Sequence, residues 1–205
     1  MSQRKTALFG GTFDPIHKGH IEVARSSIDI IGTDKLIFVP AKQSALKREL
    51  PIASDAGRLK MIRLAVEGIE RFEVSDWELQ RSSPSYTIDT VRHFQQVLGP
   101  YTEIYWLLGA DSVGELPRWY KIRELIDECV LTCMYRAGYE PPDFSHFVDS
   151  LGPERVKKLR DNIIETPLID ISSTQIRTRL AKGQDADDML NPKVAEYIRE
   201  KKLYR

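Results

Sequence analysis

The chain has 205 residues, of which 41% are hydrophobic and 29% are charged, as is usual for a folded globular protein. It carries 30 basic and 30 acidic residues, and this balance argues against a protein that coats nucleic acid. The apolar run that ends at Gly10 is too short for a signal-peptide core or a membrane span, so we expect a cytoplasmic protein without a membrane partner.

Short apolar runs alternate with helical patterns along the chain. Strands are predicted at residues 6–9, 36–39, 72–74, 104–108, 130–134 and 167–170. Helices are predicted at 17–30, 53–67, 87–98 and 121–127, then from Ser172 through Arg179, and finally from Asn191 and Pro192. An irregular loop is predicted at 136–147. The pattern predicts an α/β fold, a Rossmann-like, doubly wound parallel sheet of five to six strands with flanking helices.

Polar segments follow the predicted ends of three strands. They are Gly10, the run Gly109-Ala110-Asp111, and the run Ser172-Ser173-Thr174. Ligands of open parallel sheets bind at the carboxyl ends of the strands. We therefore expect these three segments to meet at one edge of the sheet.

Cys129 and Cys133 are the only cysteines, and both fall in an apolar segment predicted as a strand. Four positions apart on a strand, they would point to the same face. Because they lack the C-x-x-C spacing of a zinc site, core packing is the favoured interpretation and no structural metal site is predicted.

The run Gly10-Gly11-Thr12-Phe13-Asp14-Pro15-Ile16-His17-Lys18-Gly19-His20, called here the glycine–histidine loop, is the most informative part of the sequence. Two glycines after a strand permit positive φ and close approach of the backbone to an anion. Two histidines three positions apart share a helix face and can donate hydrogen bonds to a phosphate. A plain strand–turn–helix junction is the alternative, and the crowding of these residue types argues against it.

The loop resembles the H-x-G-H signature of the nucleotidyltransferases. The longer run is similar to the bacterial nicotinate-nucleotide adenylyltransferases, whereas the related phosphopantetheine adenylyltransferases usually carry threonine at the place of His17. This resemblance implies that the catalytic residues are His17 and His20. It also implies that ATP contacts Gly10, Gly11, Thr12, Phe13 and His20.

The run Ile171-Ser172-Ser173-Thr174-Gln175-Ile176-Arg177 has two compatible interpretations. Ser172 with Gln175 fits a capping box at a helix start. The run also matches the I-S-S-T-x-I-R motif of the family, which implies that Ser172, Ser173, Thr174 and Arg177 bind the β- and γ-phosphates of ATP. We accordingly expect one domain over 1–205, in which a helical portion at 172–205 completes the ATP site.

The acceptor is indicated by two further stretches, which resemble the family motifs S-Y-T-x-x-T and G-A-D-x-x-x-x-L-P-x-W. Tyr86 and Thr87 stand at a predicted helix start, where free N–H groups attract a carboxylate, and Trp119 offers a face for a pyridine ring. The resemblance implies that the substrate-binding residues are Tyr86, Thr87, Gly109, Asp111, Trp119 and Arg136. Taken singly, Thr87 as a helix cap and Trp119 as a core aromatic are equally good interpretations, and Lys47 remains open between phosphate binding and a solvated surface.

The resulting hypothesis is that AMP passes from ATP to nicotinate mononucleotide, giving nicotinate adenine dinucleotide and pyrophosphate, with Mg²⁺ bound to the phosphates. Two alternatives stay open. One is an enzyme that prefers nicotinamide mononucleotide or another phosphorylated cofactor precursor, and the other is a nucleotide sensor without turnover. The sequence does not indicate the oligomeric state.

Overall fold

The computed structural model of the chain describes residues 4–43 and 49–205. Within these ranges six strands form one parallel sheet in the order β3-β2-β1-β4-β5-β6. The strands are β1 (Arg4–Gly11), β2 (Lys35–Pro40), β3 (Phe72–Val74), β4 (Thr102–Gly109), β5 (Val130–Arg136) and β6 (Ile163–Thr166). The strand order reverses between β1 and β4, so the predicted Rossmann-like, doubly wound sheet is confirmed.

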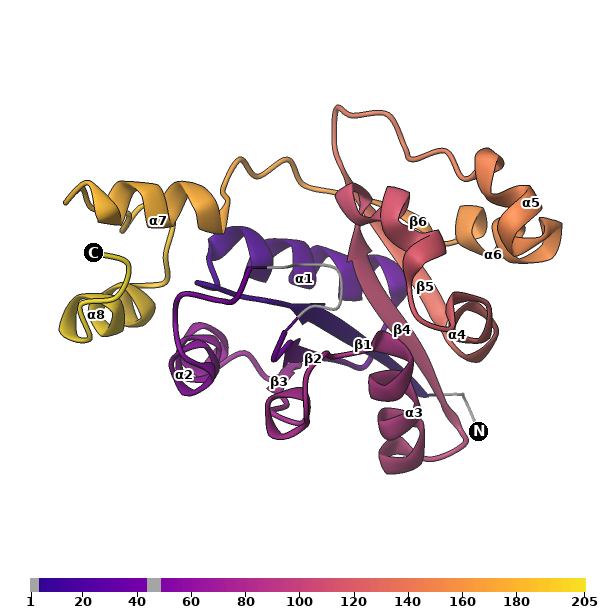
Figure 1. The fold of residues 1–205 in the computed structure, drawn as a ribbon, viewed down its shortest axis with the longest axis horizontal. Coiled ribbons are helices and arrows are strands. Elements are labelled where there is room, and N and C mark those ends of the chain that lie inside the picture. The colour runs from indigo at the N-terminus through magenta and orange to yellow at the C-terminus, as the bar shows by residue number, and fades with distance from the viewer. Residues whose placement is uncertain (1–3, 44–48) are drawn as a thin grey trace.

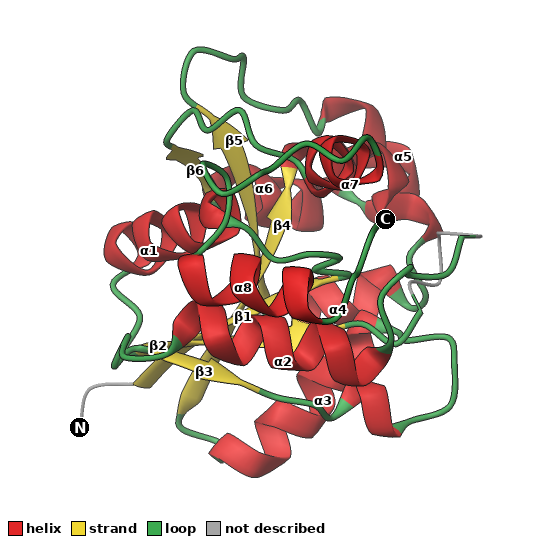
Figure 2. Cartoon of the chain, turned by 90° about the vertical axis from the view of Figure 1, so that its left-hand side faces the viewer, coloured by secondary structure: helices red, strands yellow, loops and turns green. Residues whose placement is uncertain are grey.

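Helices cover both faces of the sheet (Figure 1). One face carries α1 (Lys18–Ile31), α2 (Asp55–Val66) and α8 (Pro192–Glu200), and Figure 2 shows α8 lying against α2. The other face carries α3 (Thr87–Leu98), α4 (Ile122–Glu128) and α6 (Pro153–Asp161). The remaining helical elements are α5 (Val148–Leu151), α7 (Ser173–Ala181) and 3₁₀ segments at Glu78–Gln80, Ala110–Arg118 and Ser145–Phe147.

The alternation of side chains along the strands divides the core into two layers. Ala7 and Phe9 of β1 pack among the residues of α1 and α2, whereas Leu8 between them packs with α3 and α4. The same alternation separates Leu107 from Trp106 on β4. Because both faces of these strands are buried, their sequences are apolar runs without a polar side.

Local capping chemistry fixes several helix starts where they were predicted. Ser172 caps α7 by accepting a hydrogen bond from the Gln175 N–H, and the Gln175 side chain returns to the Ser172 backbone. Asn191 caps α8, with Pro192 in the first turn. The predicted bounds of α3 agree with those observed.

The last predicted strand was placed wrongly. Strand β6 is Ile163–Thr166, and the predicted segment 167–170 is irregular. Pairing with β5 ends at Thr166, and Pro167 has no N–H with which to continue the ladder. Within the predicted segment, Leu168 is exposed. The helices at 148–161 were not predicted.

The two cysteines do not share the predicted strand. Cys133 is a buried residue of β5, but Cys129 caps the carboxyl end of α4 before the strand begins. Burial raises the pKa of both thiols, that of Cys133 to about 12. Both thiols are therefore protonated at neutral pH, which is consistent with packing. No helix of the described ranges is long and apolar enough to cross a bilayer.

Candidate active site

The glycine–histidine loop runs from the end of β1 into the first turn of α1. Gly10 and Gly11 are the last residues of β1, and neither has the positive φ that was predicted. Glycine suits position 10 for a different reason. A Cβ there would lie 2.4 Å from the Trp106 ring. The left-handed backbone falls on Phe13 instead, at φ 49°, and its buried ring contacts Phe9 and His20.

His17 and His20 form a reciprocal pair at the start of α1. The His20 N–H donates to His17 Nδ1 at 3.4 Å, and the His17 N–H donates to His20 Nδ1 at 3.3 Å. The rings are stacked, with centroids 3.7 Å apart. Gly19 lies close to this pair, since a Cβ there would lie 3.0 Å from His17 Nδ1 and would press on the imidazole.

Both imidazoles are neutral at physiological pH. Burial and the nearby Arg136 guanidinium lower the pKa of His17 to about 4. Burial and His17 lower the pKa of His20 well below its usual value. Since each Nδ1 accepts a backbone hydrogen bond, each Nε2 carries the proton, and the pair presents two N–H donors.

Side chains from distant parts of the chain hold the backbone of the loop. Arg58, from α2, donates to the Thr12 carbonyl at 2.7 Å. The Arg177 guanidinium donates to the Asp14 carbonyl at 2.8 Å, and the Ser173 hydroxyl donates to the Pro15 carbonyl at 2.9 Å. The start of α7 therefore lies directly against the loop.

This contact brings together two of the three polar segments that were expected to meet. Ser172 serves as the helix cap, Thr174 is exposed, and its hydroxyl accepts a hydrogen bond from Arg177. The third segment follows β4, the strand that pairs with β1, and Asp111 within it is exposed. A Cβ on Gly109 would lie 2.5 Å from Asp111 Oδ1, so a side chain there would displace the Asp111 carboxylate.

At two further predicted site residues, Tyr86 and Trp119, polar groups lack a side-chain partner among the described residues. Tyr86 begins α3 without a side-chain cap, which leaves first-turn N–H groups available. Its ring lies 4.6 Å from that of Tyr120, the neighbour of Trp119. The buried Trp119 indole N–H has no hydrogen-bond partner within the described residues.

The segment after β2 connects the loop to the start of α3. The Ala41 N–H donates to the Gly11 carbonyl, the Lys42 N–H donates to the Ser85 hydroxyl, and the Ser85 N–H donates to the Gln43 carbonyl. Arg136, at the end of β5, is exposed and acts electrostatically on His17. The candidate residues thus gather at the carboxyl edge of the sheet, while Lys47 lies outside the described residues.

Several buried polar residues at this edge were not singled out from the sequence. They are Asp14, Arg58, Glu78 and Tyr204, each less than a tenth exposed. Glu78 accepts a hydrogen bond from Thr90 at 2.5 Å, and burial raises the pKa of its carboxyl group. Arg58 lies in an ordinary helical pattern and Tyr204 follows a basic run, so neither carried a local signal.

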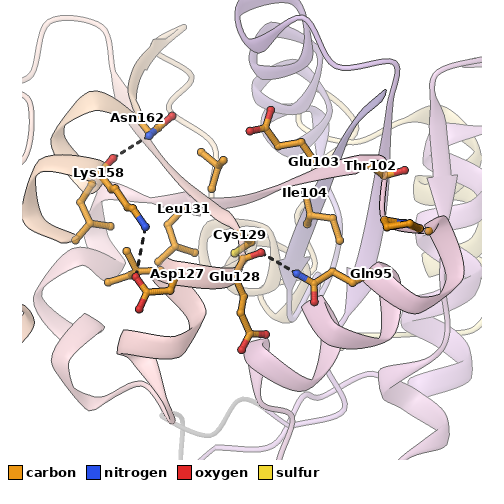
Figure 3. Close-up of a pocket in the computed structure, with 15 residues that line it drawn as sticks. Gln95, Thr102, Glu103, Ile104, Asp127, Glu128, Cys129, Leu131, Lys158 and Asn162 are labelled. Atoms are coloured by element: carbon orange, nitrogen blue, oxygen red, sulfur yellow. Dashed lines mark hydrogen bonds and ion pairs between the residues drawn. The ribbon is translucent and has the colours of Figure 1, made fainter. Parts of the chain in front are cut away.

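A cavity of about 530 Å³ lies at the opposite edge of the sheet, between the starts of β4 and β5 (Figure 3). Its polar groups are paired within the fold, since Lys158 contacts Asp127 and Gln95 donates to the Glu128 carbonyl. None of the predicted site residues lines it. In the described ranges, no three His, Cys, Asp or Glu residues cluster as metal ligands would.

Comparison with known proteins gives consistent results. The sequence profile of the cytidylyltransferase-like family matches residues 8–179. A probable nicotinate-nucleotide adenylyltransferase of Dehalococcoides mccartyi is 39% identical over 100% of this chain and 98% of its own. One of Methylacidiphilum infernorum is 38% identical over 98% of this chain and 92% of its own.

Solved structures share the fold. Nicotinic acid mononucleotide adenylyltransferase of Plasmodium falciparum, complexed with NaAD, superposes with a TM-score of 0.75 at 20% identity, covering 98% of this chain and 97% of the other. A putative nicotinate-nucleotide adenylyltransferase of Vibrio parahaemolyticus gives a TM-score of 0.67 at 20% identity, covering 98% and 96%.

Proposed function

The chain belongs to the nicotinate-nucleotide adenylyltransferases of the cytidylyltransferase-like family, and we propose that it transfers AMP from ATP to nicotinate mononucleotide in NAD biosynthesis. The products are nicotinate adenine dinucleotide and pyrophosphate. The observation that carries this proposal is the stacked, neutral histidine pair at the start of α1, beside the first turn of α7.

The reaction is an in-line displacement at phosphorus. An oxygen of the acceptor 5′-phosphate forms a bond to the α-phosphorus of ATP, and the bond from that phosphorus to the oxygen bridging to the β-phosphorus breaks. The nucleophile is already an anion, so the protein need not remove a proton. Catalysis then consists of positioning the two phosphates and stabilising charge in the transition state.

His17 and His20 supply hydrogen-bond donors for that charge. In this assignment His17 orients the acceptor phosphate and the α-phosphate, and His20 stabilises the ATP phosphates. Neutral imidazoles can fill this role, because each still carries one N–H donor, at Nε2. The backbone of Gly10, Gly11, Thr12 and Phe13 is the proposed cradle of the α-phosphate.

The start of α7 is the proposed seat of the leaving pyrophosphate. The Ser173 hydroxyl and the Arg177 guanidinium contact the glycine–histidine loop. We assign these two groups, the hydroxyls of Ser172 and Thr174 and the first-turn N–H groups to the β- and γ-phosphates. In this proposal residues 172–205 belong to the same domain as the sheet and complete the ATP site.

The acceptor mononucleotide is assigned to the part of the site formed by the start of α3 and the residues that follow β4. The free N–H groups at the start of α3, near Tyr86 and Thr87, suit the nicotinate carboxylate. Trp119 is assigned to stacking on the pyridine ring, while Gly109, Asp111 and Arg136 are assigned to the rest of the mononucleotide. This arrangement favours the acid over the amide, which lacks the carboxylate charge.

Enzymes of this family use a divalent metal with ATP, and we propose Mg²⁺. The lack of a three-ligand cluster in the described ranges suits an ion coordinated mainly by phosphate oxygens and water. When bound, it neutralises charge on the triphosphate and on the departing pyrophosphate.

Product identification by mass tests the proposal. The protein is incubated with ATP and Mg²⁺ together with nicotinate mononucleotide, or with nicotinamide mononucleotide in a parallel reaction. We expect nicotinate adenine dinucleotide and equimolar pyrophosphate, with a higher kcat/KM for the acid. Equal or better turnover of the amide would overturn the acid preference, and no dinucleotide from either acceptor would overturn the function.

A further inference from the structure

Asp14 is a buried carboxylate within the glycine–histidine loop, only 5% exposed. Among the described residues, three groups donate hydrogen bonds to its oxygens. The Ile52 and Ala53 N–H groups donate at 2.7 and 3.1 Å, and the Tyr204 hydroxyl donates at 2.5 Å. These contacts join the loop to the segment that precedes α2 and to the residues that follow α8.

The same part of the loop is fixed through its backbone. Arg177 donates a hydrogen bond to the Asp14 carbonyl, and Ser173 donates one to the Pro15 carbonyl. Arg58 donates a hydrogen bond to the Thr12 carbonyl. With Tyr204, four side chains hold this part of the loop. Three of them, Ser173, Arg177 and Tyr204, lie after residue 172 in the sequence. The portion of the chain that supplies the proposed pyrophosphate seat therefore also fixes the loop that carries the histidines.

Tyr204 is fixed by burial in the core and by an unusual backbone conformation. Its side chain is 7% exposed, and its backbone has a φ of 64°, a conformation that is costly for a residue other than glycine. Burial and the hydrogen bond to Asp14 raise the pKa of its phenol, so the hydroxyl remains a donor at neutral pH.

Without this hydroxyl, the Asp14 carboxylate would lose one of its hydrogen-bond donors. Asp14 Oδ1 would keep only the longer of the two backbone contacts, from Ala53, in a place that water does not reach freely. The loop would relax to recover a partner, and Asp14 is only three residues from His17. Phosphoryl-type transfer is sensitive to shifts of this kind, because displacements of about 1 Å can cost two orders of magnitude in rate.

We propose that Tyr204, acting through Asp14, is a positioning residue for AMP transfer, which fixes the glycine–histidine loop in the geometry that presents His17 and His20 to the phosphates. The inference rests on the proposed function. It assigns to Tyr204 no contact with substrate.

The test compares Tyr204→Phe with Tyr105→Phe. Tyr105 is a matched control, because it is 9% exposed and its hydroxyl also donates to a carboxylate, that of Glu103 at 2.7 Å, within β4. We expect Tyr204→Phe to lower kcat by about 10-fold or more, with KM for nicotinate mononucleotide nearly unchanged. Tyr105→Phe should keep the kcat of the parent protein. A parental kcat in Tyr204→Phe, or equal losses in both variants, would overturn the inference.

Hydrogen–deuterium exchange of the free protein gives a readout that does not depend on turnover. Tyr204→Phe should raise exchange in peptides covering residues 12–20 and leave peptides of β4 unchanged. Unchanged exchange at 12–20 would count against the inference even if kcat falls. If the parent protein forms no dinucleotide, the proposed function fails while this measurement still decides whether Tyr204 fixes the loop.

A double-mutant cycle with Asp14→Asn isolates the coupling. If Tyr204 acts through Asp14, the loss of kcat in the double variant should be close to that of Asp14→Asn alone. Losses that multiply would mean that the two residues act independently, and this outcome would overturn the proposed route.

Discussion

The two sides of the candidate site differ in how they are held. On the donor side, the buried side chains of Arg58 and Tyr204 and the half-buried side chains of Ser173 and Arg177 donate to the carbonyls of the glycine–histidine loop and to the carboxylate of Asp14. On the acceptor side, α3 begins without a side-chain cap, and the Trp119 indole N–H has no partner within the described residues. The donor side is therefore held by many internal hydrogen bonds, whereas the acceptor side has polar groups without such partners, among them the N–H groups at the uncapped start of α3.

The largest expected effect lies on the donor side. His20→Ala should lower kcat by about 10²- to 10³-fold, because it removes a preorganised donor to the phosphates. Pyrophosphate release measures the rate, and thermal unfolding checks that the fold remains. His146→Ala, at an exposed position in a 3₁₀ segment, is the matched control. A rate within twofold of the parent protein would contradict the role of His20.

The next effect tests whether the loop needs its buried support. Arg58→Met should lower the free energy of unfolding by about 1–3 kcal/mol, because the Thr12 carbonyl loses its partner. Lys35→Met, which breaks the more exposed ion pair with Glu73, should cost about 0–1 kcal/mol. Urea unfolding of both variants measures the difference. Equal losses would mean that the loop is not specially supported.

A smaller effect is expected on the acceptor side. Trp119→Ala should raise KM for nicotinate mononucleotide by about 10-fold, since an aromatic stacking contact contributes about 0.5–1.5 kcal/mol beyond its area. KM for ATP should change little. Steady-state kinetics with each substrate varied in turn separates the two. A rise in KM for ATP alone would place Trp119 on the donor side and contradict its assignment to the acceptor side.

The smallest effect concerns Arg136, which acts on His17. The folded protein holds the pKa of His17 at about 4, while in the unfolded chain it is about 6.5. The unfolded state therefore binds the proton more readily, so this contribution to stability is complete above pH ~6.5 and decreases as the pH falls toward 4.

Arg136→Gln should raise the pKa of His17, because one of the two causes of its depression is removed. The loss of stability between pH 7 and pH 4 should then be smaller in the variant than in the parent protein, because the difference develops near the folded-state pKa of about 4. Urea unfolding at both pH values measures it, and an equal loss would show that Arg136 does not act on His17.

Sequence patterns predicted the features that depend on neighbouring residues. The capping box at Ser172, the Asn191 cap and the bounds of α3 follow from local hydrogen bonding and hydrophobic periodicity. Strand β6 was misplaced because an edge strand is defined by its single neighbour, and the register with β5 is not visible in a short apolar run.

The residues that were missed depend on long-range contacts. Arg58 lies 46 positions from Thr12, and Tyr204 lies 190 positions from Asp14. Each resembles an ordinary surface residue in its own segment, and only the tertiary fold buries it. The motif around His17 indicated the chemistry, but it did not indicate which side chains hold that motif in place.

These separations have a consequence for the order of folding. The contacts from Ser173, Arg177 and Tyr204 span 158 to 190 positions, and contacts between residues so far apart in sequence are slow to form. We therefore expect the strands of the parallel sheet to pair before these contacts form. On refolding, catalytic activity should therefore recover later than the circular dichroism of the sheet, and the final step to an active enzyme is the docking of residues 172–205.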